Sequence, residues 1–280
     1  MKGFIVINAY SKLPSAMHQP ARLKEEFEAL GVEAKIVRNS PAALEEEGDF
    51  CVFLDKDRYA ARILEKRLRL FNRAEAIELC DDKMLTHIAL QGLPMPETVP
   101  SLLCYTAVEP VSKELLDAAE QLGYPLVVKE CHGSLGKQVY LVKDRAELEK
   151  MAENLKKKPH LYQKFIDESA GRDLRVIVIG GRAVAAMKRI SDTDFRSNAE
   201  LGGRGEPYEI DEAAKNLCEE VAKRLQLDFC GIDLLFGKDG YLICEVNSNA
   251  FFGTIERVTG VNVAKLYAEH IVRTIKKETL

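Results

Sequence analysis

Two acidic side chains and one amide near the C-terminal end of the chain could together hold a metal ion. Asp233 and Glu245 each interrupt an apolar run that reads as a strand, and a turn signal at residues 238–240 joins the two runs. Side chains alternate along a strand, so Glu245 and Asn247 share a face. Asp233 joins that face only if the numbers of paired residues sum to an even value, as a turn of three or five residues gives. Three converging oxygen ligands suit Mg²⁺, whereas a hairpin with its acids at a wet sheet edge would bind none.

A lysine followed by a glycine-containing loop is a second candidate site. Lys129 ends an apolar strand predicted over residues 125–130, and the loop after it holds Gly133, Ser134 and Gly136. Backbone N–H groups of such a loop can bind phosphate oxygens, and the lysine can reach the same group. The pattern fits equally a hairpin turn beside a lysine whose stem packs on the sheet.

Further cations lie in a polar stretch and at a helix start. Arg196, Ser197 and Asn198 stand in a polar segment, residues 191–207, that reads as a loop, and Lys83 lies in the first turn of a predicted helix. Arginine and lysine neutralise phosphate oxygens, and arginine also stabilises the charge of a phosphoryl-transfer transition state. Solvation of a surface loop or a helix end explains the same residues without a ligand.

The elements that must position these groups alternate between strand and helix at the start of the chain. Apolar runs at residues 4–7, 34–37 and 50–54 predict buried parallel strands, and residues 1–79 therefore read as a small α/β domain. Ligands of open α/β sheets gather at the carboxyl ends of strands. The polar residues at those ends are either substrate contacts or solvated loop residues: Asn8, Asn39, Ser40, Asp55 and Lys56.

The rest of the chain predicts two units that contain both strands and helices, 80–160 and 161–280. Three prolines, at 94, 96 and 100, predict an extended linker within the first of them. Helices are predicted over 20–30, 42–47 and 58–68 in the N-terminal domain and over 79–91, 112–122, 144–157, 211–225 and 261–277 in the rest of the chain. Strands are predicted over 125–130, 138–142, 161–166, 173–179, 182–189, 229–236 and 241–246.

Composition bounds the class of protein. The 280 residues, with 46% hydrophobic and 30% charged, can bury one large core or two to three small ones. The formal charge of −4 gives no electrostatic reason to expect a nucleic-acid or membrane partner. The seven cysteines form no close pair, which favours reduced core residues in a cytoplasmic protein. The five histidines form no arrangement with Cys or Ser that predicts covalent hydrolysis.

From Asp82 onward, the order of these motifs resembles the ATP-grasp superfamily, and within it the RimK-like ligases, which include α-L-glutamate ligases and LysX-type enzymes. The similarity covers about 200 residues. The matching pieces are Asp82-Lys83, Gly92-Leu93-Pro94-Met95-Pro96, Val127-Val128-Lys129, Gly133-Ser134, Gln163 to Ile166, Gly171-Arg172-Asp173-Leu174-Arg175, Asp194-Phe195-Arg196-Ser197-Asn198 with Gly202-Gly203, Gly231-Ile232-Asp233, Glu245-Val246-Asn247 and Thr259-Gly260-Val261.

The resemblance implies an ATP-grasp fold of mixed α/β and α+β class: an N-terminal α/β domain, 1–79, and two α+β lobes that enclose ATP. It implies that Lys83, Lys129 and the loop with Gly133, Ser134 and Gly136 contact phosphates. The adenine-side contacts would be main-chain groups of Lys164, Phe165 and Ile166, with Asp173 near the sugar. Arg196, Ser197 and Asn198 would face the phosphate and the acyl intermediate, with Arg196, Asn198 and Lys129 as catalytic residues. Asp233, Glu245 and Asn247 would hold Mg²⁺, or Mn²⁺ in its place.

The resemblance also implies an activity. Enzymes of this kind transfer the γ-phosphate of ATP to a carboxylate, and an amine then attacks the acylphosphate to give an amide, ADP and phosphate. The substrates would be a carboxylate and an amino acid such as glutamate, and the acceptor a peptide, protein or small metabolite. A kinase that stops at phosphate transfer and a nucleotide-binding module without catalysis are the alternatives, and a homo-oligomer is left open. The chain departs from the family pattern at Gln138, where many relatives have glycine, at Lys164, where an acid is usual, and after Asn247, where Pro-Gly often follows.

Overall fold

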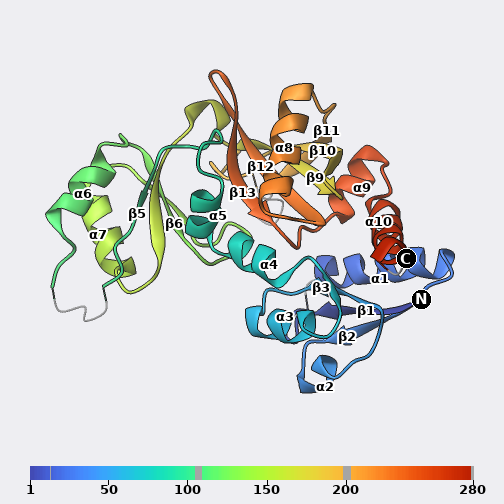
Figure 1. The fold of residues 1–280 in the computed structure, drawn as a ribbon. Helices are drawn as coiled ribbons and strands as arrows, with labels where there is room; N and C mark the ends of the chain where they lie inside the picture. Colours follow the sequence, from blue (N-terminus) through green and yellow to red (C-terminus); the bar gives the residue numbers. More distant parts are fainter. Residues whose placement is uncertain (13, 105–108, 198–202, 279–280) are drawn as a thin grey trace.

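Three β-sheets with helices packed against them form the molecule (Figure 1). The computed structural model describes residues 1–12, 14–104, 109–197 and 203–278. In Figure 1 the sheet of the N-terminal segment lies below, the second sheet lies on the left, and the third lies between and above them.

The first sheet is parallel and buried on both faces. Its strands, in spatial order, are β2 (Glu33–Arg38), β1 (Lys2–Ile7), β3 (Phe50–Leu54) and β4 (Arg69–Phe71). Apolar residues run continuously along β1 and β3, as expected for parallel strands covered by helices on both sides. α1 (Pro14–Ala29) packs on one face, and α3 (Arg58–Glu65) and α4 (Ala74–Asp81) pack on the other. α2 (Pro41–Leu44) is a single turn that the Ser40 side chain caps.

The second sheet is antiparallel and carries the glycine-containing loop. Its strands, in spatial order, are β5 (Thr98–Pro100), β8 (His160–Lys164), β6 (Leu126–Glu130) and β7 (Val139–Val142). α6 (Lys113–Glu120) and α7 (Arg145–Leu155) bury its apolar side chains. Ser112 caps α6, as its position before an apolar helix predicts. α5 (Lys83–Ala89) precedes this sheet in the chain and contacts the third sheet.

The third sheet is antiparallel and has five described strands. In spatial order they are β11 (Arg204–Pro207), β10 (Arg182–Ile190), β9 (Arg172–Ile179), β12 (Phe229–Gly237) and β13 (Gly240–Asn247). α8 (Glu212–Arg224) covers one face, where alternate strand residues such as Val176 and Ile232 are apolar and buried. Charged residues lie toward one end of the other face, among them Arg175, Arg189 and Glu245, which line the cavities described below.

The N-terminal sheet and the third sheet share one hydrophobic core. Phe27 of α1 and Phe229 of β12 belong to a buried cluster that also includes residues of α9 (Gly253–Thr259) and α10 (Val263–Glu278). Asn72, just after β4, adds a polar connection. Its Nδ2 donates to the carbonyl oxygens of Phe229 and Ser248 at 2.7 and 3.0 Å, and its Oδ1 accepts from the N–H groups of Asp228 and Phe229. The N-terminal segment is therefore fixed directly to the start of β12 and to the residue that follows β13.

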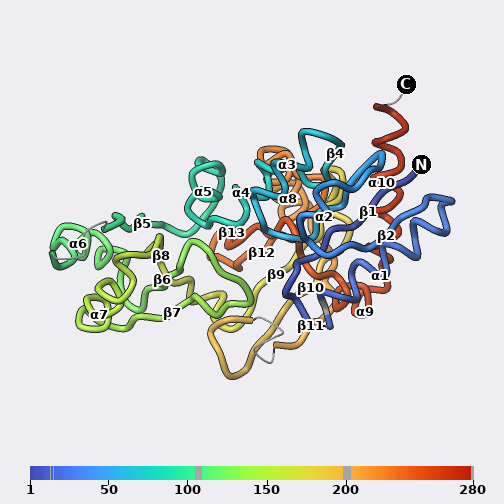
Figure 2. Tube along the Cα trace, turned by 90° about the horizontal axis from the view of Figure 1, so that it is seen from below, coloured from blue at the N-terminus to red at the C-terminus, as the bar shows by residue number. Residues whose placement is uncertain are grey.

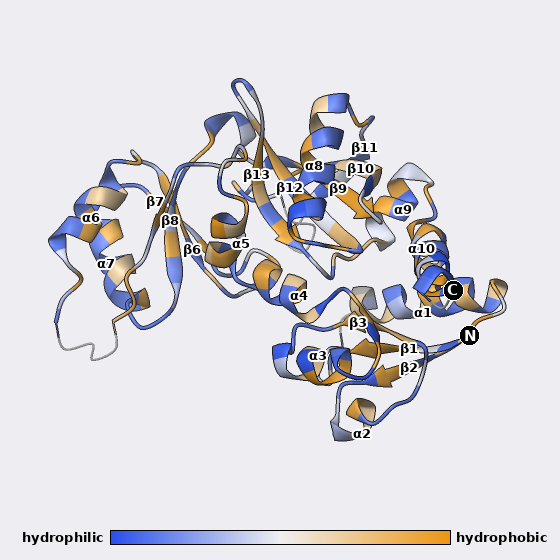
Figure 3. Cartoon of the chain, viewed as in Figure 1, coloured by the Kyte–Doolittle hydropathy of each residue, from blue (hydrophilic) through white to orange (hydrophobic). Residues whose placement is uncertain are grey.

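The molecule is elongated, with the third sheet at its centre. Seen from below, it runs from α6 and α7 at one end to α1 and α10 at the other, where both termini lie (Figure 2). Apolar residues gather on the strands and on the helix faces that meet them, and polar residues cover the outer faces (Figure 3). Among the helices described, none combines the length and the apolar character that crossing a membrane requires. A short 3₁₀ helix of three residues, η1 (Asp167–Ser169), links the second and third sheets.

Candidate active site

A β-bulge brings the predicted metal ligands to one face of the third sheet. The turn between β12 and β13 has two residues, 238–239, so the even-numbered pairing that Asp233 needs does not come from a turn of three or five residues. In a regular ladder, that turn would set Asp233 opposite Cys244. The register shifts at this point, so Cys244 is the extra residue and Asp233 lies opposite Glu245. Because Glu245 and Asn247 alternate along β13, all three side chains share the face that the sequence pattern predicts.

Asp233 is buried and bound by two arginines. Arg175 donates from Nε to Oδ1 and from Nη2 to Oδ2, both at 2.6 Å, and Arg189 Nη2 lies 2.8 Å from Oδ2. Burial by itself would raise the pKa of Asp233, but Arg175 and Arg189 outweigh it and hold the pKa below its ordinary value. The strand register explains the pairing, since Arg175 of β9 lies opposite Asp233 of β12.

Asp173, predicted to lie near a sugar, is held by the same network. Arg189 lies opposite Asp173 in the β9–β10 pair and donates from Nε to its Oδ1 at 2.7 Å. Arg189 is 5% exposed and Asp173 7%. Arg189 therefore bridges two buried carboxylates, which pairs its buried charge.

The predicted metal ligands fit a hard cation. A carboxylate has about four lone pairs, of which the two arginines take three at Asp233 and leave one on Oδ1. Glu245 is contacted by Lys83 Nζ at 3.7 Å, and the buried Nδ2 end of the Asn247 amide has no partner among the described residues. The two ends of an amide are distinguished only by their hydrogen bonds, so this end can present oxygen. Within the described chain no three His, Cys, Asp or Glu side chains gather around one point, so the amide is needed to complete the set.

A cavity of about 100 Å³ between the second and third sheets brings most of the predicted residues together. Lys83 and Lys129 both line it, and Lys129 is 7% exposed with Nζ 3.5 Å from Cys244 Sγ. The other predicted residues that line it are Gly136, Lys164, Phe165, Ile166, Asp173, Arg196, Ser197, Asp233 and Glu245. Asn198 lies outside the described residues, so its predicted role stays a prediction.

The glycine-containing loop is closed by one of its own side chains. Gly133 and Gly136 adopt positive φ angles of 155° and 71°, and a Cβ on Gly133 would lie 2.5 Å from Gln138 Oε1. The Ser134 N–H donates to that same oxygen at 3.3 Å. The residue at which the chain departs from the family pattern, Gln138, thus covers an amide that was predicted to bind phosphate.

Arg196 connects this loop to the polar segment that follows β10. Its Nη1 donates to the Gly136 carbonyl at 2.6 Å, and its Nε and Nη2 donate to Asp194 at 2.9 and 2.8 Å. Asp194 accepts hydrogen bonds from Arg196, and its pKa is lowered below the ordinary value for that reason. The Gly136 carbonyl and the Asp194 carboxylate therefore position the Arg196 side chain at the cavity wall.

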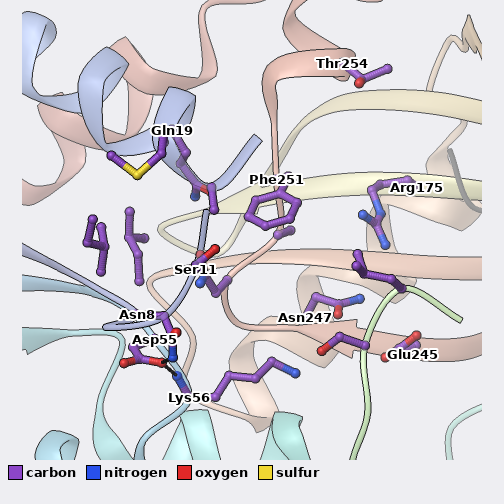
Figure 4. A pocket seen from close by; sticks show the side chains of 18 of the residues that line it. Asn8, Ser11, Gln19, Asp55, Lys56, Arg175, Glu245, Asn247, Phe251 and Thr254 are labelled. Carbon is purple, nitrogen blue, oxygen red and sulfur yellow. Dashed lines mark hydrogen bonds between the residues drawn. The ribbon is translucent and has the colours of Figure 1, made fainter. Parts of the chain in front are cut away.

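A second cavity, of about 360 Å³, lies between the N-terminal sheet and the third sheet (Figure 4). Figure 4 shows Asn8, Asp55 and Lys56 on its N-terminal side, Gln19 entering from α1, and Glu245, Asn247 and Arg175 on the opposite side. Its other polar and loop residues include Ser11, Ser134, Leu135, Arg189, Asn249 and Phe251. Glu245 and Arg189 line both cavities, so the two cavities meet at these side chains.

The candidate contacts from the N-terminal domain separate into two groups. Asn8, Asp55 and Lys56 line the second cavity, whereas Asn39 and Ser40 do not. Asp55 is 5% exposed, and its carboxylate accepts from Asn8 Nδ2 at 2.9 Å and from Asn39 Nδ2 at 2.8 Å. Lys56 pairs with Asp81 at 2.7 Å. Asn39 therefore supports the cavity wall from behind.

Sequence reasoning missed Arg189, Gln19 and Phe251. An arginine at the end of the apolar strand 182–189 was a readable signal for Arg189, because its alternate neighbours in the strand face the core. Gln19 sits among other polar residues in a helix, and the sequence gives no signal for it.

Comparisons with known proteins agree with this geometry. The RimK-like ATP-grasp domain model matches residues 80–271. The chain is 39% identical over 222 residues to N-acetylaspartylglutamate synthase A of Homo sapiens, and this match covers 77% of the chain and 56% of that protein. The identity and coverage are the same for β-citrylglutamate synthase B of Homo sapiens. The chain spans about half the length of these curated relatives.

A solved structure gives the same assignment. The RimK domain protein ATP-grasp from Sphaerobacter thermophilus is 25% identical and superimposes with a TM-score of 0.72, covering 95% of this chain and 98% of that one. The predicted ATP-grasp fold is thereby confirmed. The chain belongs to the RimK-like ATP-grasp family.

Proposed function

We propose that this chain is an ATP-dependent carboxylate–amine ligase that forms an amide through an acylphosphate and releases ADP and phosphate. The observation that carries the proposal is the pair of cavities that meet at Glu245 and Arg189. One cavity is lined by lysines and arginines, as a nucleotide phosphate requires, and the other is walled by polar residues of the N-terminal domain. A phosphoryl group bound where they meet would face both a nucleotide and a second substrate.

ATP would occupy the smaller cavity as a substrate. Lys83 and Lys129 both line this cavity and would neutralise phosphate charge, and the loop amide of Gly136 would supply a further donor. Lys164, Phe165 and Ile166 line this cavity, and their main-chain donors and acceptors would pair with an adenine edge. Lys164 is exposed, so its side chain does not displace the base.

The reaction would proceed in two balanced steps at the junction of the cavities. A carboxylate oxygen of the second substrate attacks the γ-phosphorus, the bond from that phosphorus to the β,γ-bridging oxygen breaks, and ADP leaves. A neutral amine then attacks the acyl carbon, phosphate leaves, and the amine proton passes to solvent. Arg189 lines both cavities and Arg196 lines the smaller one, and both would stabilise the charge on the transferring group and on the acyl oxygen.

Asp233, Glu245 and Asn247 would hold Mg²⁺, and Mn²⁺ could replace it. When bound, the ion would neutralise the β- and γ-phosphate oxygens. The three side chains contribute two negative charges and one neutral oxygen, and the remaining ligand positions are left to phosphate and water. Arg175, through its two bonds to Asp233, keeps the Asp233 carboxylate fixed for that task.

Glutamate is the amine that the comparisons favour. Both human relatives are named for products that contain glutamate joined to a small acid. The second cavity has the volume of sites that bind small molecules. We therefore propose that the enzyme joins the amine of glutamate to a small carboxylic acid, with a peptide or protein acceptor as the second choice.

The test is ADP and phosphate release from Mg²⁺-ATP with pools of carboxylic acids, with and without glutamate, and with hydroxylamine to trap an acylphosphate. We expect release that requires both an acid and an amine, and mass spectrometry should show the amide. A hydroxylamine-trapped product without dependence on an amine would favour a kinase. Tight ATP binding without turnover in any pool would favour a binding module and overturn the proposal.

A further inference from the structure

Unpaired buried polar atoms concentrate in the second cavity. Among the described residues, five buried side-chain polar atoms have no hydrogen-bond partner, and three of them belong to residues that line this cavity: Gln19 Nε2, Asn247 Nδ2 and Asn249 Oδ1. Leaving such an atom unpaired costs free energy, so native proteins rarely do it without a ligand or a functional reason. Asn247 is accounted for by the proposed metal site. Gln19 and Asn249 have no role in the reaction described so far.

Gln19 places a buried hydrogen-bond donor in the wall of the cavity. It lies in α1, outside the residues 80–271 that the family model matches, and it is 1% exposed. In the orientation that the structure gives this amide, its unpaired end is Nε2, a donor, so the group that pairs with it is an acceptor oxygen. In Figure 4, Gln19 and Glu245 lie on opposite sides of the cavity.

We propose that Gln19 selects the acid substrate by donating a hydrogen bond to a second oxygen of that acid, remote from the carboxylate that is phosphorylated. This inference rests on the proposed function. The reacting carboxylate must lie near Glu245 and Arg189, where the cavities meet, and Gln19 reaches into the cavity from the N-terminal side. One carboxylate cannot satisfy both positions. The substrate class is therefore a small acid with a second carboxylate, carbonyl or hydroxyl oxygen, and a simple monocarboxylic acid is a poor substrate.

The polar lining of the cavity supports a polar second group. Arg175, Arg189 and Lys56 line it, each paired with an aspartate, and the Asp55 carboxylate already accepts from the amides of Asn8 and Asn39. Asn249 Oδ1 is an acceptor, which suits an N–H or O–H of the substrates and not a carboxylate. Donor and acceptor sites in the same wall allow the cavity to distinguish acids by the position of their second group.

The experiment compares acids that differ only in the second group. Amide formation with glutamate and Mg²⁺-ATP is measured for butyrate against succinate, and for citrate and N-acetylaspartate, in the wild type and in Gln19→Met, Gln19→Glu and Gln121→Met. Met has nearly the volume of Gln but cannot donate, and Glu reverses the polarity of the contact. Gln121 is exposed at the end of α6, far from the cavity in sequence and fold, and serves as the matched control.

We expect the best acid with a second oxygen to exceed butyrate by at least tenfold in kcat/KM. Gln19→Met should raise the KM for that acid about tenfold, with the KM values for ATP and butyrate unchanged. Gln19→Glu should raise it further, by about a hundredfold, if the second group is a carboxylate. Gln121→Met should match the wild type.

Thermal melting gives a readout that does not depend on turnover. Because Gln19 has no partner to lose within the described chain, unliganded Gln19→Met should melt no lower than the wild type. The preferred acid should raise the melting temperature of the wild type and not that of the variant. A wild-type KM and a wild-type acid-induced shift in Gln19→Met would overturn the inference, as would an increase confined to the KM for glutamate. If no acid yields an amide in the wild type, the proposed function fails, and the acid-induced shift alone still tests Gln19.

Discussion

Glu245 is the site carboxylate whose charge is compensated least. Asp233 and Asp173 are each bound by an arginine at 2.8 Å or less, whereas the cation recorded near Glu245 in the described chain is Lys83, at 3.7 Å. A carboxylate that no close cation compensates can bind a metal ion or can stay without a partner. We expect Glu245→Gln to lower kcat/KM by about a hundredfold or more, because it removes a charge from the ion site.

Binding and folding measurements separate that explanation from a structural one. Calorimetry should show weaker Mg²⁺-ATP binding by Glu245→Gln, and circular dichroism should show an unchanged fold. Glu209→Gln, a substitution of an exposed acid between β11 and α8, should behave as the wild type. Wild-type rates in Glu245→Gln would remove this residue from the proposed ion site.

His160 makes the stability of the second sheet depend on pH. It is 3% exposed, its Nδ1 lies 2.8 Å from the Lys158 carbonyl, and its Nε2 lies 2.8 Å from the Tyr162 hydroxyl. The first nitrogen donates to the carbonyl and the second accepts from the hydroxyl, so the ring is neutral. Burial lowers the pKa of His160 below its ordinary value of 6.5. Below pH 6.5 the unfolded chain therefore binds a proton that the folded chain resists.

The contribution of His160 to the free energy of unfolding should consequently be complete above pH 6.5. It should decrease as the pH drops toward the lowered pKa, by at most about 1.4 kcal/mol per pH unit for this one group. Urea denaturation between pH 5 and 8 would measure it. His160→Gln should flatten that part of the curve, and His132→Gln, at an exposed histidine, should leave it intact. Equal slopes in the wild type and His160→Gln would contradict the assignment.

At the scale of elements, a side chain next to the glycine-containing loop accepts a hydrogen bond from one of the loop's own amides. Gln138 Oε1 occupies the Ser134 N–H, and phosphate would have to displace it. We expect Gln138→Ala to bind ATP a few-fold more tightly, since a hydrogen bond of about 1 kcal/mol no longer competes. Gln138→Glu should bind ATP more weakly, because it keeps an acceptor there and adds a negative charge. Dissociation constants from fluorescence titration would decide, and equal values in all three proteins would show that the loop amide does not bind phosphate.

Periodicity predicted most of the strands and helices but not their breaks. The helix predicted over 79–91 is two helices, because the Asp82 backbone is extended and its side chain caps α5 through the Met84 and Leu85 amides. The helix predicted over 58–68 ends at Glu65, and its last residues lead into β4. A capping aspartate fits within a helical pattern, and a three-residue edge strand is too short to show a period.

The candidate site was predictable where one element supplies it. Alternation along β13 placed Glu245 and Asn247 on one face, whereas the bulge at Cys244 depends on how β12 and β13 pair and leaves no mark in the sequence. The pairing of Arg175 and Arg189 with Asp233 also depends on register across three strands. Asn198 stays a prediction, since it lies outside the described residues.

At the scale of the whole molecule, the second cavity exists only because two distant parts of the chain meet. Its walls come from β1, α1 and the end of β3 on one side and from the third sheet on the other. The division at residues 1–79, 80–160 and 161–280 stays a prediction, while the shared hydrophobic core shows that the N-terminal segment packs on the third sheet. Specificity for the acid should therefore depend on how firmly these parts are joined.

Asn72 provides the polar contacts between the N-terminal segment and the third sheet. Its substitution tests whether acid specificity depends on how these parts are joined. Its four hydrogen bonds fix Asp228, Phe229 and Ser248, and Asn72→Ala would leave two buried N–H groups and two carbonyls without this partner. We expect the free energy of unfolding to fall by about 3–5 kcal/mol, measured in urea. The KM for the acid should rise more than the KM for ATP, because the larger cavity lies across the joint and the smaller one does not. Asn154→Ala, at an exposed position in α7, is the control. Equal changes in both KM values would mean that Asn72 supports the fold without setting the geometry of the acid site.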